Sequence, residues 1–240
     1  MHQKEVAIIV AGGKGLRLPG DTPKQFIEIG GQPVLMHTIS AFRAYSQTVE
    51  VLLVLPQVDF DRWTSLCRKY HFDHQITLVA GGPTRFQSVK NGLRAITGPG
   101  LVAVHDGVRP LVTVEIIAAS FDIARKYRSA VASVALKESI REIRNTDKAG
   151  VPPTELSDGL SFAVDRKKFR LMQTPQAFDI DLLKSSYDLP EDDAFTDDAS
   201  VVERAGHSIM LFDGSYENLK ITTPEDLVVA EAIIRSRMKK

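Results

Sequence analysis

Residues 6–17 of this 240-residue chain read VAIIVAGGKGLR, and residues 23–25 read PKQ. The first six are apolar and rich in β-branched side chains, which predicts a buried strand. That strand runs directly into a glycine-rich loop carrying Lys14 and Arg17, and Lys24 follows soon after. Backbone amides of such loops close around phosphates while nearby cations neutralise them. We therefore expect a phosphate site here; the alternative is an ordinary solvated turn.

Beyond this stretch, short apolar runs alternate with helical patterns. Strands are predicted at 49–55, 75–80, 101–105 and 130–136. Helices are predicted at 34–42, with Pro33 in the first turn, and at 59–70, 84–96 and 114–127. This alternation favours an α/β fold with a doubly wound, Rossmann-like sheet that is mixed but mostly parallel. The run 101–105 delivers Asp106 and Arg109 at its carboxyl end, where open α/β sheets bind ligands.

The alternation fails between Lys137 and Arg170, where the chain is charged, turn-rich and contains pieces resembling hairpin arms. Long excursions of this kind are usually functional or interfacial. We expect residues 137–166 to project as a β-arm from a single domain spanning 1–240. Beyond the arm, order returns at 171–178, and the remaining elements are predicted as helices at 180–187 and 197–205, a strand at 207–212 and a helix from Pro224.

Bulk composition restricts the class of protein. Thirty basic and thirty acidic residues cancel, so there is no global field to attract nucleic acid or a membrane surface. The lone Cys67 cannot form an internal disulfide, and no apolar run approaches the roughly 18 residues of a membrane span. An apolar content of 43% suits a globular core, and we expect a cytoplasmic protein.

Two common nucleotide-binding patterns do not fit the glycine loop. A third glycine at the dinucleotide-binding spacing would fall on Leu18, and no Gly-Lys-Ser/Thr follows at the Walker distance. Asp197-Asp198 lacks a convincing metal-ligand spacing, and we attribute it to helix capping and solvation. His105, at a strand end, is expected to be structural.

Six motifs nevertheless occur in a recognisable order. They are AGGKGLR (11–17) with PKQ, GGPTRFQSV (81–89), HDGVRP (105–110), QTPQ (173–176), TDDAS (196–200) and NLKIT (218–222). Together they resemble the methylerythritol 4-phosphate cytidylyltransferases of non-mevalonate isoprenoid synthesis, from about residue 6 to about residue 234. The resemblance implies a nucleotide-diphospho-sugar transferase type of fold and transfer of a cytidylyl group from CTP to a sugar-alcohol phosphate, with release of pyrophosphate.

The resemblance also implies roles for individual residues. Catalytic roles fall on Arg17, Lys24, Lys220 and Arg166; nucleotide binding falls on Ala11, Gly12, Gly13, Gly15, Gly82, Ser88 and Asp106; sugar-phosphate binding falls on Arg109, Ser139, Arg166 and Thr174. Mg²⁺ is expected, held mainly by the CTP phosphates with Asp106 nearby. The chain departs from the family at Pro83, where an acidic residue is frequent, and at Ser139, where threonine is usual.

By the same resemblance, the arm of residues 137–166 hooks around a twin, which implies a homodimer with active sites shared between subunits. Three alternatives stay open from the sequence. Ribitol 5-phosphate could be the acceptor, since its cytidylyltransferases share most of the motifs. A nicotinamide-dependent reductase would need an acidic residue at the end of the second strand, where Leu55-Pro56 stands. A non-catalytic nucleotide sensor would have little reason to keep Arg17, Lys24 and Lys220 together.

Overall fold

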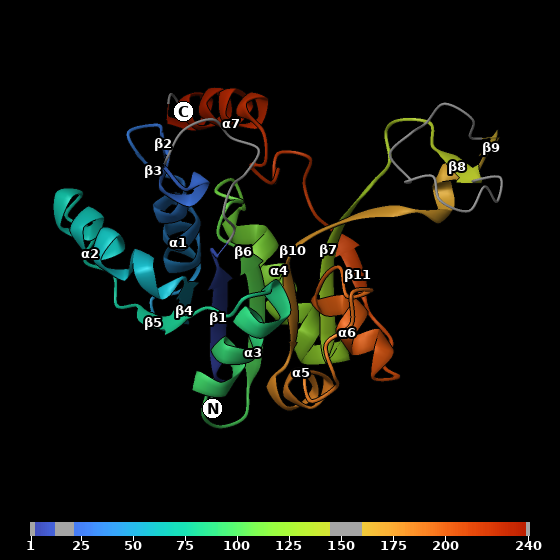
Figure 1. Cartoon of the computed structure of the whole chain (residues 1–240), viewed down its shortest axis with the longest axis horizontal. Coiled ribbons are helices and arrows are strands. Elements are labelled where there is room, and N and C mark those ends of the chain that lie inside the picture. The colour runs from blue at the N-terminus through green and yellow to red at the C-terminus, as the bar shows by residue number, and fades with distance from the viewer. Residues whose placement is uncertain (1–2, 13–21, 145–159, 239–240) are drawn as a thin grey trace.

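The computed structural model describes residues 3–12, 22–144 and 160–238 (Figure 1). Its strands are β1 (Glu5–Val10), β2 (Glu28–Ile29), β3 (Gln32–Pro33), β4 (Glu50–Leu55), β5 (Thr77–Ala80), β6 (Leu101–Asp106), β7 (Ser129–Ala135), β8 (Arg141–Arg144), β9 (Leu160–Ala163), β10 (Arg170–Asp179) and β11 (Leu211–Asp213). Its helices are α1 (Val34–Tyr45), α2 (Phe60–Lys69), α3 (Arg85–Ala95), α4 (Val114–Tyr127), α5 (Ile180–Ser186), α6 (Asp198–Arg204) and α7 (Pro224–Met238).

In these described residues, seven strands form the central sheet in the order β11-β7-β10-β6-β1-β4-β5. Only β10 runs against its neighbours β6 and β7, while the other pairings are parallel. The predicted mixed, mostly parallel sheet is therefore confirmed. From β1 the chain moves outward to β4 and β5, then returns to β6 on the other side of β1. The switch point of the sheet thus lies between β1 and β6, where ligands bind in folds of this kind.

Each face of the sheet carries its own hydrophobic core, because successive side chains of a strand point to opposite faces. Along β1, Ala7 and Ile9 pack in one core with α1, α2 and α4. Val6 and Ile8 pack in the other core, with α3, α5 and α6. All six residues of β6 are buried, as expected of a central strand covered on both faces. The helices thereby hold the carboxyl ends of β1 and β6 in fixed positions.

The arm extends well away from the sheet (Figure 1). The chain leaves β7, forms β8 and β9 at a distance from the core, and returns along β10. Strands β8 and β9 pair antiparallel, with Arg141 opposite Ala163 and Ile143 opposite Ser161. Ile143 of β8 and Phe162 of β9 are about half exposed, at 52% and 45%. The projecting β-arm of the predicted fold is thus present, with an apolar surface open to solvent in this single chain.

Two local details differ from the sequence prediction. Pro33 does not lie in the first turn of a helix; it is the last residue of β3 and immediately precedes α1. The C-terminal strand covers only Leu211–Asp213, because the backbone at Ser208 and Met210 bonds to the side-chain hydroxyl of Ser129. Within the ranges that the structure describes, no helix has the length and apolar character required to cross a membrane.

Candidate active site

A cavity of about 660 Å³ opens at the switch point of the sheet. Its walls come from the loops that follow β1, β4, β5 and β6, together with two segments from opposite ends of the sequence. The lining residues are Val10, Ala11, Gly12, Lys24, Gln25, Pro56, Gly82, Pro83, Thr84, Arg85, Ser88, Asp106, Val108 and Lys220. The cavity therefore brings together Ala11, Gly12, Lys24, Gly82, Ser88, Asp106 and Lys220, seven of the residues singled out from the sequence. Gly13, Gly15 and Arg17 lie outside the described residues.

The loop after β5 forms one wall, and the hydroxyl of Ser88 holds it in place. Ser88 is buried; its Oγ accepts a hydrogen bond from the Gly82 amide at 3.1 Å and donates one to the Thr84 carbonyl at 2.8 Å. Thr84 in turn caps α3 by accepting from the Gln87 amide. A Cβ on Gly82 would lie 2.3 Å from that of Gln87, so a side chain there would displace the first turn of α3. Ser88 thus shapes this wall in addition to facing the cavity.

Asp106 is the electrostatic centre of the site. Its Oδ2 lies 3.0 Å from Lys220 Nζ and 3.3 Å from Arg109 Nε, and its Oδ1 lies 3.8 Å from Arg85 Nε. Burial alone would raise the pKa of this carboxyl, but the charges of Lys220, Arg85 and Arg109 outweigh it and hold the pKa well below its usual range. Asp106 is therefore ionised at all physiological pH values, and it fixes cations from three separate segments.

Arg109 and Thr174 lie one layer beneath the cavity. Arg109 is buried and donates to the Asn218 carbonyl at 2.8 Å as well as to Asp106. Thr174 accepts the backbone N–H of Asp106 at 3.1 Å through its Oγ1. Neither lines the cavity in this chain. Their contacts in the structure brace Asp106 and the segment carrying Lys220.

Ser139 and Arg166 flank the arm, Ser139 on its way out before β8 and Arg166 on its way back after β9. Both are exposed, and neither lines the cavity of their own chain. Arg166 Nη1 donates to the carbonyl of Lys137, which joins the two sides of the arm at its base. The structure therefore separates these two residues from the other predicted site residues within one chain.

His105 lies directly before Asp106 on β6 and is fully buried, packing edge-on against Phe42. Its Nε2 lies 3.3 Å from the Arg109 carbonyl, to which it donates, and Nδ1 has no partner in the described residues. Burial lowers the pKa of His105 to about 4, so the imidazole is neutral near pH 7. This agrees with the structural role expected from the sequence.

Arg85 is the site residue whose importance was missed. Its guanidinium binds the fully buried carboxylate of Asp198 through two hydrogen bonds of 3.0 and 2.6 Å, and Tyr187 donates to the same carboxylate at 2.6 Å. Burial alone would lower the pKa of Arg85, but Asp198 and Asp106 outweigh it and raise the pKa. Arg85 thus links Asp198 on α6 to Asp106 at the cavity.

The interpretation of Asp197-Asp198 as capping residues is half right. Asp197 caps α6, accepting the Ser200 amide in a reciprocal capping box. The interpretation is wrong for Asp198, which neither caps the helix nor faces solvent, because its side chain turns inward to the Arg85 guanidinium. Asp197 precedes α6 with an extended backbone (φ −155°, ψ −176°), whereas Asp198 is the first helical residue, so the two neighbouring carboxylates reach different partners. The signal available in the sequence was Arg85 itself, placed between Gly82 and Ser88.

Comparisons with known proteins agree with this geometry. A family model described as 2-C-methyl-D-erythritol 4-phosphate cytidylyltransferase matches residues 5–236. A protein of that name from Bacteroides thetaiotaomicron is 46% identical over 231 residues, covering 96% of this chain and all of that protein. One from Porphyromonas gingivalis W83 is 44% identical, covering 98% and 100%.

Solved structures give the same assignment. A 4-diphosphocytidyl-2C-methyl-D-erythritol synthase from Anaerococcus prevotii superposes with a TM-score of 0.80 at 31% identity, covering 97% of this chain and 96% of that one. The 2-C-methyl-D-erythritol 4-phosphate cytidylyltransferase from Thermus thermophilus gives a TM-score of 0.71 at 30% identity, covering 98% and 100%. Because these matches take in both Gly12 at one end of the chain and Lys220 at the other, the chain belongs to the 2-C-methyl-D-erythritol 4-phosphate cytidylyltransferase family of nucleotidyltransferase enzymes.

Proposed function

We propose that this chain joins CTP to 2-C-methyl-D-erythritol 4-phosphate through the cavity at the switch point. A phosphate oxygen of the acceptor forms a bond to the α-phosphorus of CTP, and the bond from that phosphorus to the β-phosphate oxygen breaks, releasing pyrophosphate. The observation that carries the proposal is the meeting of Lys24, from one end of the chain, and Lys220, from the other, over a glycine-lined wall.

The chemistry explains why cations are the central groups. A phosphate monoester is mostly dianionic near pH 7, since its second pKa is about 6. The nucleophile therefore needs no general base, and the barrier is repulsion between two anions. Fixed cations at the α-phosphorus lower that barrier most when they are already in place. We assign this role to Lys24, to Lys220 and to Arg17, which lies outside the described residues.

The nucleotide would enter between the loops after β1 and β5. Ala11 and Gly12 line one side, and Gly82 and Ser88 line the other. Pro83, which also lines the cavity, has no amide N–H to offer a base. Selection of cytosine at that point would therefore rely on neighbouring backbone groups and on shape. We propose that Gly13 and Gly15, which lie outside the described residues, belong to the same nucleotide site.

Mg²⁺ fits this site as a companion of the triphosphate. Mg²⁺ keeps an octahedral oxygen shell and is commonly held by one or two carboxylates plus substrate phosphates. Asp106 Oδ1 receives only a 3.8 Å contact from Arg85 among the described residues, so it can contribute one oxygen. No group of three or more His, Cys, Asp or Glu side chains suited to a metal occurs within the part of the chain that the structure describes. When bound, the ion would offset phosphate charge, and Asp106 would be the protein's contribution.

The acceptor site is proposed to be completed by a second copy of the chain. Arg109 and Thr174 brace the cavity from below, whereas Ser139 and Arg166 stand beside the arm. Phe162 and other apolar side chains on or next to the arm are exposed in the single chain, as at an unformed interface. A homodimer would bury these residues and bring Ser139 and Arg166 to the partner's cavity.

The proposed donor is an intracellular nucleotide, so we place the protein in the cytoplasm. The test is pyrophosphate release by purified protein with CTP and Mg²⁺, using 2-C-methyl-D-erythritol 4-phosphate and D-ribitol 5-phosphate in separate reactions. Release with the first acceptor is expected. Release only with ribitol 5-phosphate would change the acceptor, release with neither would favour a nucleotide sensor, and hydride transfer would favour a reductase.

The matched variant pair for this assay is Lys220→Met and Lys126→Met. Lys220→Met removes a cation from the cavity, and kcat/KM is expected to fall about 100-fold, as for loss of one preorganised charge-stabilising group. Lys126 is exposed on α4, away from the cavity lining, and its replacement should leave turnover unchanged. Equal turnover by the two variants would rule out the role given to Lys220.

A further inference from the structure

A third hydrophobic cluster lies apart from the two faces of the sheet. It contains Ile29, Val108, Ile221, Ala230 and Ile234, together with a few neighbours. These residues belong to the segments that carry Lys24, Asp106 and Lys220, and to α7. One small core therefore supports the charged groups of the cavity from behind.

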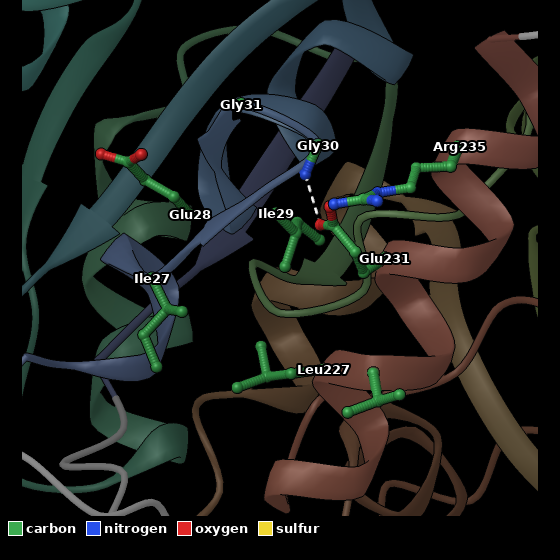
Figure 2. A pocket seen from close by; sticks show the side chains of 9 residues that line it. Ile27, Glu28, Ile29, Gly30, Gly31, Leu227, Glu231 and Arg235 are labelled. Atoms are coloured by element: carbon green, nitrogen blue, oxygen red, sulfur yellow. Dashed lines mark hydrogen bonds and ion pairs between the residues drawn. The ribbon is translucent and has the colours of Figure 1, made fainter.

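At one end of this cluster, α7 packs against the turn between β2 and β3 and is hydrogen-bonded to it. The Gly30 amide donates to Glu231 Oε2 at 2.5 Å, and Figure 2 shows Glu231 reaching from α7 to that turn. Gly30 has a positive φ of 56°, and a Cβ there would lie 2.5 Å from Ile234 Cγ2. Helix and turn thus approach too closely for a side chain. The hairpin held in this way begins four residues after Lys24.

At its other end, α7 is hydrogen-bonded to the segment that carries Lys220. Asp226 Oδ2 accepts the amides of Thr222 at 2.7 Å and Thr223 at 2.8 Å, and also the Thr222 hydroxyl at 2.8 Å. The amide of Ile221 donates to the Val108 carbonyl at 2.9 Å, which ties the same segment to the loop after β6. Lys220 is therefore next to a backbone stretch fixed on two sides.

We propose that Glu231 and Asp226 are positioning residues for the reaction, with α7 setting the placement of Lys24 relative to Lys220. The two carboxylates lie five residues apart on one helix, a spacing of about 7.5 Å along a rigid axis. Glu231 fixes the hairpin that follows Lys24, and Asp226 fixes the turn that follows Lys220. Neither carboxylate touches the cavity, so each acts through a lysine. This inference rests on the proposed roles of those lysines.

The decisive comparison is Glu231→Ala against Glu231→Gln. Alanine removes the acceptor for Gly30, whereas glutamine keeps an amide oxygen that can accept the same N–H. A misplacement of about 1 Å can cost up to about 100-fold in rate, and we expect kcat to fall roughly 10-fold in Glu231→Ala, with the KM for each substrate changed far less. Glu231→Gln should recover most of kcat. Glu203→Ala, at an exposed glutamate of α6, is the matched control and should match wild type.

Two further measurements separate positioning from simple stability. Each variant is assayed far below its own unfolding midpoint, where a purely structural loss leaves kcat per folded molecule unchanged. In a Lys24→Met background, Glu231→Ala should cost much less than it does alone, because its target is already gone. Wild-type kcat in Glu231→Ala, or full additivity with Lys24→Met, would overturn the inference while leaving the proposed function intact. A wild-type protein without turnover would overturn both. Asp226→Ala offers the same comparison from the Lys220 end.

Discussion

Replacing Asp198 with alanine is expected to lower the free energy of unfolding by about 3 kcal/mol, at the low end of the 3–5 kcal/mol cost of breaking a buried ion pair. The carboxylate is fully buried and accepts two hydrogen bonds from Arg85, at 3.0 and 2.6 Å, and one from Tyr187 at 2.6 Å. Alanine leaves the guanidinium and the phenol without this acceptor. The low end applies because the Arg85 side chain is 30% exposed and can regain some hydration.

The assay is urea unfolding of wild type, Asp198→Ala and Asp198→Asn. The midpoint should fall with the slope m unchanged, since the folded surface is nearly the same. Asparagine keeps an oxygen for Tyr187 and loses the charge, so its cost should be smaller, about 1–2 kcal/mol. Replacing both partners, as in Arg85→Met with Asp198→Leu, should recover part of the loss because no charge is left unpaired. If the free energy of unfolding of Asp198→Ala lies within about 1 kcal/mol of the wild-type value, the Arg85–Asp198 pair does not stabilise the contact between α3 and α6.

Two other perturbations test charge and assembly. Burial lowers the pKa of His105 to about 4. An unfolded histidine titrates near 6.5, so between these values the unfolded chain binds the extra proton and stability rises with pH, by about 3 kcal/mol over the window. Urea unfolding of His105→Gln should lack that slope, and retention of the wild-type slope would refute the assignment. For the arm, Arg166→Ala and Lys220→Met should each be nearly inactive, yet mixing them through denaturation and refolding should restore about a quarter of wild-type activity if each site takes Arg166 from the partner. No recovery in verified mixed dimers would contradict shared sites.

Much of the fold was predictable because its strands are buried on both faces. Runs such as 49–55 and 101–105 are almost wholly apolar, and covered parallel strands leave that pattern in any sequence. The β2–β3 hairpin left no comparable signal, because two-residue strands are too short to show an alternation. Its only marker was Gly30-Gly31, both at positive φ in the structure.

The sequence indicated which residues gather at the candidate site better than it indicated which of them line the cavity and which lie beneath it. Motif order identified Lys24, Asp106 and Lys220, and the structure places all three at one cavity. It did not reveal that Arg109 lies beneath the cavity, because the sequence around an arginine does not say which of its neighbours will cover it. The prediction for Asp198 failed for a related reason. Its carboxylate can be buried only because Arg85, 113 residues away in the sequence, pairs with it.

Two carboxylates meet three cations around the cavity before any substrate arrives, which leaves an excess of positive charge suited to binding anions. Asp106 and Asp198 together face Arg85, Arg109 and Lys220, and buried charges need such partners to be tolerable. The three cations differ in freedom. The Arg109 side chain is 10% exposed and tied to backbone, whereas the Lys220 side chain is 41% exposed and reaches Asp106 through a single ammonium. In the proposed reaction, an incoming triphosphate can therefore draw Lys220 away from Asp106. The Asp106 carboxylate then stays paired, because Arg109 and Arg85 remain beside it. In that reaction, the arginines would hold Asp106 in place, and Lys220, the most exposed of these three cations, would contact the triphosphate together with Lys24.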